Sequence, residues 1–274
     1  MSVPATELTE RLESAVAFAL EASAIPRRYF LTDGLVIDRK ADDSPVTRAD
    51  KETEELLRAR IEAACPDDTI IGEEFPDKPG TSGFTWYLDP IDGTESFVRG
   101  VPLFGTMVGL QHDGESVAGV IDFPALGEIV YAAKGSGAWW ATNSNGASRI
   151  ADLDLREAHV SSVAALGDAA VSTTGLAHLF EEGGVAEQWQ ALMKLVNVAR
   201  GYGDCYGHYL VATGRVDVHL DAVMNVWDNA PLLPIVTEAG GRFTDTKGNA
   251  IIDGGSGLST NGLLHDAVLA VLRG

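Results

Sequence analysis

Residues 86–97 read WYLDPIDGTESF. The aromatic and apolar residues at the start of this stretch predict a β-strand that presents Asp89 at its end. Gly93 then permits a sharp turn into a helix, which we expect to begin around Thr94. Asp89 and Asp92 should therefore converge beside the N-terminus of that helix.

Such a helix end favours an anion, because its backbone N–H groups are unpaired and its dipole is positive there. The carboxylates of Asp89 and Asp92 would repel a phosphate at this place unless cations lay between them. Oxygen ligands without Cys or clustered His favour Mg²⁺ over Zn²⁺. Taken alone, the pair fits a solvated Asp-rich turn equally well.

Two further acidic motifs, GEE and WD, supply Glu73 and Asp228. If these carboxylates meet Asp89 and Asp92, neighbouring pairs about 5 Å apart repel by roughly 3 kcal/mol each at an effective dielectric constant of 20. Protonation relieves one such pair, whereas bound cations relieve all of them. Four converging carboxylates therefore favour a metal site over a solvated turn.

Four motifs occur together in this chain: GEE (72–74), DPIDGT (89–94), WD (227–228) and EAGG (238–241). With these motifs the chain resembles the inositol monophosphatase family over nearly its whole length. The resemblance implies an α/β (α+β layered) fold, a sandwich of alternating helix and sheet layers built from two fused subdomains. We expect residues 1–150 to supply most metal ligands and residues 151–274 to supply Asp228 and the specificity residues.

The resemblance also implies a mechanism for hydrolysing a phosphate monoester of a small alcohol. The backbone N–H groups of Gly93 and Thr94 would hold the phosphate. Glu73 and Thr94 would orient and deprotonate the attacking water, with Asp92 in the catalytic set. Two or three Mg²⁺ ions would be held by Glu73, Asp89, the carbonyl of Ile91, Asp92 and Asp228.

The second half carries the features expected to select the substrate. Residues 202–206 (YGDCY), residues 211–217 and Asp221 resemble the histidinol-phosphatase branch of the family more than its inositol monophosphatases. Histidinol phosphate carries an ammonium and an imidazole, for which Asp221, Asp204 and Glu95 are candidate partners. We therefore favour histidinol phosphate over an inositol phosphate. Related histidinol phosphatases often have Lys where this chain has Glu95.

Several other residues have open roles. Lys40 and Asp50 match a family segment that overhangs the active site, but Asp50 also completes a capping box with Thr47 at the start of a helix. The six histidines show no metal-ligand spacing and are interpreted as core or surface residues. Of these, His208 and His219 could approach the substrate pocket.

Composition limits the partners. Forty Asp and Glu against twenty Lys and Arg give a formal charge of −20, which disfavours nucleic acid and anionic membranes. Cys65 and Cys205 lie far apart without zinc-type spacing, and no apolar run approaches a membrane span, so we expect a soluble cytoplasmic protein. The family resemblance implies a homodimer.

Local patterns predict the order of elements and one chain division. Asn145 and Gly146 predict a tight hairpin turn, and residues 147–156 form the candidate boundary between the halves. The expected helices include one that ends before Pro26 and one from the Thr47 cap to Pro66. Strands are expected at 70–71, 84–88, 107–110, 117–121, 129–132, 169–173 and 216–220, and further helices at 187–196, 205–213, 229–239 and 263–272.

Two other classes of function are alternatives, a nucleotide-binding module and a catalytically silent relative. Residues 201–207 (GYGDCYG) superficially match a dinucleotide-binding fingerprint, but the spacing is one residue too long. A catalytically silent relative that binds metal or a partner is the second reading. Phosphate release that depends on Mg²⁺ would separate that protein from an enzyme.

Overall fold

The computed structural model describes residues 3–40, 44–181 and 185–274. The DPIDGT stretch lies at the end of the second strand of a seven-stranded sheet. The first two strands are parallel, and every later pair is antiparallel. In sheet order the strands are β3 (Thr69–Gly72), β4 (Phe84–Asp92), β5 (Gly105–His112), β6 (Glu115–Phe123), β7 (Glu128–Ala133), β8 (Ala138–Ala141) and β9 (Arg156–Glu157).

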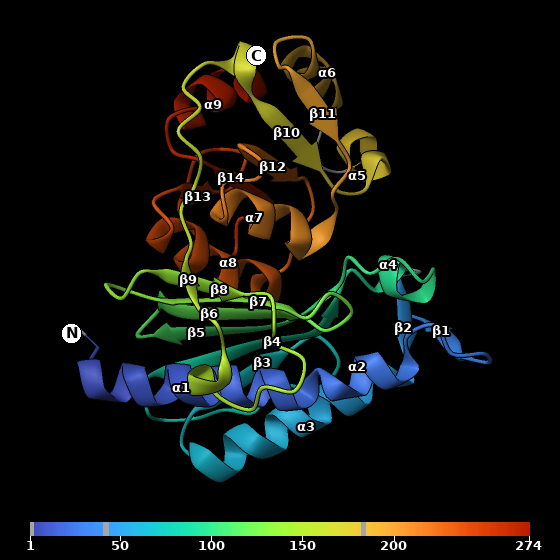
Figure 1. Ribbon diagram of the computed structural model, residues 1–274, viewed down its shortest axis with the longest axis vertical. Coiled ribbons are helices and arrows are strands. Elements are labelled where there is room, and N and C mark those ends of the chain that lie inside the picture. Colours follow the sequence, from blue (N-terminus) through green and yellow to red (C-terminus); the bar gives the residue numbers. More distant parts are fainter. Residues whose placement is uncertain (1–2, 41–43, 182–184) are drawn as a thin grey trace.

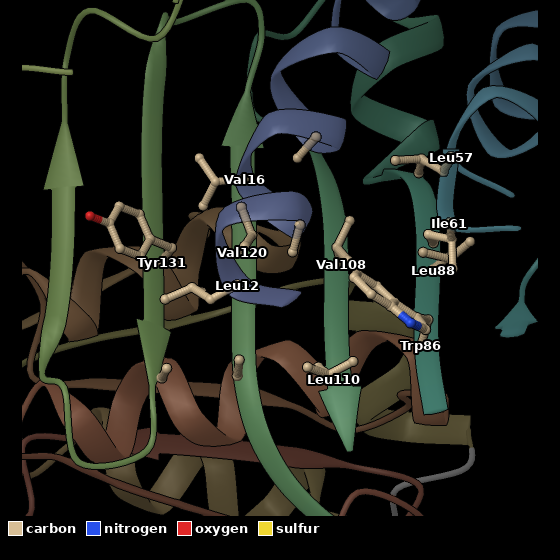
Figure 2. Packing of buried hydrophobic residues seen from close by; sticks show 14 of the residues in the cluster. Leu12, Val16, Leu57, Ile61, Trp86, Leu88, Val108, Leu110, Val120 and Tyr131 are labelled. Atoms are coloured by element: carbon tan, nitrogen blue, oxygen red, sulfur yellow. The ribbon is translucent and has the colours of Figure 1, made fainter. Parts of the chain in front are cut away.

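Helices α1 (Ala5–Ala22) and α3 (Arg48–Ala64) cover one face of this sheet. Figure 2 shows Leu12 and Val16 of α1 pointing onto the strands, where Val108 and Val120 meet them. Val16, Val108 and Val120 are at most 1% exposed, and fully burying such a side chain contributes roughly 1.5–3 kcal/mol. This apolar interface fixes β4 and hence the position of its acidic end.

Helices α7 (Asp204–Ala212) and α8 (Val226–Glu238) lie on the opposite face of the sheet. Two glycines allow this close contact. A Cβ atom at Gly119 would lie 2.2 Å from the carbonyl oxygen of Pro231, and one at Gly109 would lie 2.8 Å from the Cβ atom of Ala230. Because α8 lies directly on β5 and β6, its first turn reaches the acidic end of β4.

A second sheet of five strands covers the other side of α7 and α8, and helices α6 and α9 cover its outer face (Figure 1). The molecule is thus built as five alternating layers of helix and sheet. The second sheet is ordered β11 (Val198–Arg200), β10 (Ala170–Thr173), β12 (Val218–Asp221), β14 (Gly257–Thr260) and β13 (Arg242–Thr244), and the outer helices are α5 (Leu176–Glu181), α6 (Ala186–Met193) and α9 (His265–Arg273).

The remaining elements are short. The hairpin of β1 and β2 leads into α3, and α4 follows directly on β4. Their bounds, with those of α2 and the two 3₁₀ turns, are α2 (Ala24–Tyr29), β1 (Ile37–Arg39), β2 (Pro45–Thr47), α4 (Thr94–Val98), Ile150–Asp152 and Leu166–Asp168.

The layered α/β arrangement expected from the sequence is confirmed, and each expected strand and long helix overlaps an observed one. The tight hairpin expected at Asn145 and Gly146 is wrong, because these residues form a turn within a longer loop between β8 and β9. Asn143 shapes that loop by accepting a hydrogen bond from the backbone N–H of Asp154 at 3.0 Å. Strand β9 lies beyond residue 150 but belongs to the first sheet, and the division into residues 1–150 and 151–274 stays a prediction.

Candidate active site

Three carboxylates meet where β4 ends and α8 begins. One oxygen of each of Asp89, Asp92 and Asp228 lies within 4.8 Å of the others. Two carboxylates three residues apart would point to opposite faces of a regular strand. The pairing of β4 with β5 shifts between Asp89 and Asp92, however, and this irregularity brings both side chains to one side. The predicted convergence of these three residues is confirmed.

Burial and mutual repulsion hold protons on this cluster when no cation is present. Burial and the charge of Asp228 raise the pKa of Asp92 to about 7. The pKa of Asp228 is also raised to about 7, by burial and by Glu73 among others. Burial, Glu73 and Asp92 raise the pKa of Asp89 well above its usual range. A buried set of carboxylate oxygens without Cys or His matches the ligands of a hard divalent ion.

Glu73 lies beside this cluster at the end of β3, where its backbone N–H bonds the carbonyl oxygen of Leu88 at 3.2 Å. Its charge acts on Asp89 and Asp228. The carboxylate of Glu73 is held by the Lys40 ammonium at 2.6 Å. Lys40 therefore contacts a predicted metal ligand directly.

Thr94 occupies the first turn of α4, with its hydroxyl 2.9 Å from the carbonyl oxygen of Ile91 and 3.4 Å from a carboxylate oxygen of Asp50. The other Asp50 oxygen accepts hydrogen bonds from the backbone N–H and the hydroxyl of Thr47, so the predicted capping box is present. Burial raises the pKa of Asp50 to about 6. Asp50 thus caps α3 and also approaches Thr94.

Gly93 supplies the turn that the sequence predicted, with a φ of 82°. A Cβ atom at this position would lie 2.9 Å from a carboxylate oxygen of Asp204 and 3.0 Å from the carbonyl oxygen of Leu103. The backbone of the expected phosphate cradle therefore lies directly against the first residue of α7.

A pocket extends from the carboxylate cluster into the second half of the chain. Its wall contains Asp92 and Asp228 and continues through Asp204 and Asp221. Asp204 adopts a φ of 57°, and burial with the nearby Asp92 raises its pKa well above the usual range. The other residues that line this pocket are Thr173, Thr174, Gly175, Ala222, Val223 and Met224.

A sequence profile of the inositol monophosphatase family matches residues 7–273. The chain belongs to this family. It is 40% identical over 266 residues to the histidinol-phosphatase of Chlorobaculum parvum, covering 97% of each chain, and 40% identical over 262 residues to that of Mycobacterium tuberculosis, covering 94% of this chain and 96% of the relative. The comparisons confirm the expected enzyme class, a phosphate monoester hydrolase.

A solved structure of this fold supports the arrangement of layers. The extragenic suppressor protein SuhB of Bartonella henselae superposes with a TM-score of 0.84 at 27% identity, and the match covers 95% of this chain and 97% of the other. In this chain, residues 3–40, 44–181 and 185–274 contain no helix that could span a membrane.

Glu95 lies apart from the other predicted substrate contacts. Its side chain is 53% exposed on α4, and its carboxylate pairs with Arg99 one helical turn later. Glu95 is also absent from the wall of the acidic pocket. Its predicted contact with substrate stays a prediction.

The sequence did not predict the surroundings of Asp221. Both His208 and His219 are fully buried and lie within hydrogen-bond distance of its carboxylate. One signal was present in the sequence, since His219 and Asp221 are two residues apart on a strand and must share a face. The contact of His208 with Asp221 could not be predicted in this way, because it depends on how α7 packs against the second sheet.

Proposed function

We propose that this member of the inositol monophosphatase family is a Mg²⁺-dependent histidinol-phosphatase, which hydrolyses histidinol phosphate to histidinol and inorganic phosphate. The observation that carries the proposal is the acidic wall that runs from Asp92 and Asp228 to Asp204 and Asp221. Two relatives that bear this enzyme name, each 40% identical, support it.

The proposed substrate matches this wall in charge. Histidinol phosphate carries an ammonium and an ionisable imidazole next to its phosphate ester, whereas an inositol phosphate carries only hydroxyls. A pocket with several carboxylates attracts a cation and offers it hydrogen-bond acceptors. An inositol phosphate would leave Asp204 and Asp221 without a charged partner.

Two or three Mg²⁺ ions would be held by the predicted ligands at the end of β4. When bound, these ions would neutralise the phosphate and stabilise the negative charge that develops on the leaving oxygen. The backbone N–H groups of Gly93 and Thr94 would hold the phosphate oxygens. The predicted metal ligands are Glu73, Asp89, the carbonyl of Ile91, Asp92 and Asp228.

The attacking water would be oriented by Glu73 and by the hydroxyl of Thr94. The Thr94 hydroxyl lies near a carboxylate oxygen of Asp50. Thr94 can therefore pass its hydroxyl proton to Asp50 while its oxygen accepts a proton from the attacking water. With a pKa of about 6, Asp50 is poised to act as a base near neutral pH. We therefore propose a catalytic role for Asp50 in addition to its capping of α3.

The decisive experiment measures phosphate release from histidinol phosphate, an inositol phosphate, a nucleoside monophosphate and a sugar phosphate, each with Mg²⁺ and with EDTA. We expect Mg²⁺-dependent turnover and the highest kcat/KM with histidinol phosphate. A preference for inositol phosphate would transfer the proposal to that substrate. Absence of turnover on every ester would indicate the catalytically silent alternative.

The same proposal includes a homodimer in the cytoplasm. The free thiols of Cys65 and Cys205 support a reducing compartment, and the family resemblance supports the dimer. Light scattering on the purified chain would test the dimer, with a mass of twice 29.0 kDa expected.

A further inference from the structure

A buried network surrounds Asp221 in the second half of the chain. The Nε2 atoms of His208 and His219 lie 3.2 Å and 3.3 Å from the same carboxylate oxygen, Oδ2. The backbone N–H of Thr174 donates to the other oxygen, Oδ1, at 3.1 Å. Both histidines are fully buried, and Asp221 is 5% exposed. The three side chains come from α7 and β12, so the network joins a helix to the second sheet.

The hydrogen-bond partners define the orientation of both rings. An ionised carboxylate only accepts hydrogen bonds, so each Nε2 atom that faces Asp221 carries a hydrogen. The Nδ1 atom of His219 lies 2.7 Å from the hydroxyl of Ser172, and that of His208 lies 2.6 Å from the hydroxyl of Ser259. Each serine hydroxyl can donate to the Nδ1 atom that it faces, and burial lowers the pKa of His208 to about 4, so His208 binds Asp221 as a neutral donor.

A neutral donor such as His208 has a consequence that a Lys or Arg partner would not have. It fixes the carboxylate without cancelling its negative charge, so Asp221 can still attract a cation. Oδ2 already accepts two hydrogen bonds, whereas Oδ1 accepts one and keeps capacity for another donor. Because Asp221 lines the acidic pocket, that capacity is available to a bound ligand.

The backbone also accommodates this network. A Cβ atom at Gly207 would lie 2.1 Å from Cε1 of His219. Only glycine at this position of α7 therefore lets the His219 ring lie against the helix. The rings of His208 and His219 meet edge to face with centroids 4.4 Å apart, which restricts the movement of both.

We propose that His208 and His219, held by Ser259 and Ser172, are positioning residues that fix Asp221 as a charged acceptor for the cationic group of the substrate. This inference rests on the proposed function, because it names the residues that make the site selective for an amine-bearing phosphate ester. The phosphate would bind at the carboxylate cluster, whereas His208 and His219 lie behind Asp221 and do not line the acidic pocket, so hydrolysis should depend little on the two histidines.

The test compares two substrates in variants of both histidines. His208→Leu and His219→Leu remove the donors, while His208→Gln and His219→Gln keep an N–H group near the former Nε2 position. We expect each Leu variant to raise KM for histidinol phosphate about tenfold, as for loss of one hydrogen bond to a charged group. The kcat values and the KM for p-nitrophenyl phosphate, which has no cation, should stay within about twofold, and the Gln variants should recover part of the loss.

His265→Leu is the matched control. His265 is also fully buried and bonds Thr244 and Thr260, but these contacts lie outside the acidic pocket. This variant should lose stability without changing the ratio of the two KM values. If the Leu variants at the network do not fold, Ser172→Ala and Ser259→Ala remove the hydroxyls that orient the rings and should shift the same ratio.

The outcomes separate the inference from the proposed function. A wild-type protein that fails to hydrolyse histidinol phosphate refutes both. Wild-type activity combined with equal KM changes for both substrates refutes the inference alone, as does a shifted ratio in the His265 variant. A stoichiometric transition metal that is lost in His219→Gln would likewise refute it, since the histidines would then be metal ligands.

Discussion

Replacing Asp89 with Asn should stabilise the protein when divalent ions are absent and remove most of its activity when they are present. Asn keeps an oxygen that can accept the Ile91 backbone N–H, which Asp89 binds at 3.0 Å. The substitution removes one ionisable group from a set of three converging carboxylates. Stability and activity should therefore change in opposite directions.

The magnitude follows from the geometry of the cluster. With oxygens within 4.8 Å of one another, each ionised pair repels by about 3 kcal/mol at an effective dielectric constant of 20. Loss of Asp89 removes two of the three pairs, but the protein already sheds part of this repulsion by binding protons. Burial and Glu73 raise the pKa of Asp89 itself, and Asp92 and Asp228 have pKa values of about 7. We expect a net gain of about 2 kcal/mol at pH 8, or roughly 5 °C in Tm for a chain of this size.

Thermal unfolding in EDTA and in a Mg²⁺ series measures this effect, and phosphate release measures the activity. The wild-type Tm should rise with Mg²⁺, because a ligand that binds only the folded state stabilises it. The variant should show a higher Tm in EDTA, a much smaller rise with Mg²⁺ and a kcat lowered at least roughly a hundredfold.

Asp245→Asn is the matched control. Asp245 is also buried, but it accepts backbone hydrogen bonds from Lys247 and Asn249 at 2.9 Å and 2.8 Å, and these outweigh burial and lower its pKa. The same chemical change should therefore destabilise the protein there. A lower Tm for Asp89→Asn in EDTA, with the Mg²⁺ response retained, would refute the electrostatic account of the cluster.

Three further predictions concern the surroundings of the cluster. Lys40→Gln removes the cation 2.5 Å from the buried Glu74 carboxylate and should cost about 2 kcal/mol at pH 8. The loss should be smaller at pH 5 in urea titrations, because Glu74 has a pKa of about 7 and is then protonated; equal losses would contradict this. Gly93→Ala places a side chain at positive φ, so it should lower the free energy of unfolding by about 1–2 kcal/mol and should lower kcat. Unchanged turnover would contradict this prediction. In EDTA, the free energy of unfolding should fall by about 5 kcal/mol from pH 5 to pH 8, because Asp92 and Asp228 both have folded pKa values of about 7, above the usual 3.8. Saturating Mg²⁺ should remove the part of the fall that these two carboxylates cause, while Glu74 with its pKa of about 7 continues to titrate. A fall of unchanged size in Mg²⁺ would show that Asp92 and Asp228 are not the groups responsible.

Much of the first half of the site could be predicted because its determinants are local. The strand, the glycine turn and the helix start follow one another between Trp86 and Thr94, so residue type alone indicates where the carboxylates lie. The capping box at Thr47 and Asp50 is local in the same sense. The WD motif indicated Asp228 as a metal ligand, but local sequence could not predict its position. That position depends on the packing of α8 against Gly109 and Gly119 of the neighbouring strands.

The second half was harder to predict. Strands β11, β13 and β14 have only three or four residues, too few for an alternating pattern to be recognised. The network around Asp221 joins residues from four separate segments, and only the spacing of His219 and Asp221 is visible along the chain. Glu95 lies next to the cradle in sequence, yet on α4 it pairs with Arg99 and faces solvent.

The most direct test of the account is anomalous diffraction from crystals grown with Mn²⁺ in place of Mg²⁺. We predict at least one strong peak between the carboxylates of Asp89, Asp92 and Asp228, with Glu73 released from Lys40 toward the ion. The absence of any peak among these side chains at saturating Mn²⁺ would contradict the claim that the acidic cluster is a metal site.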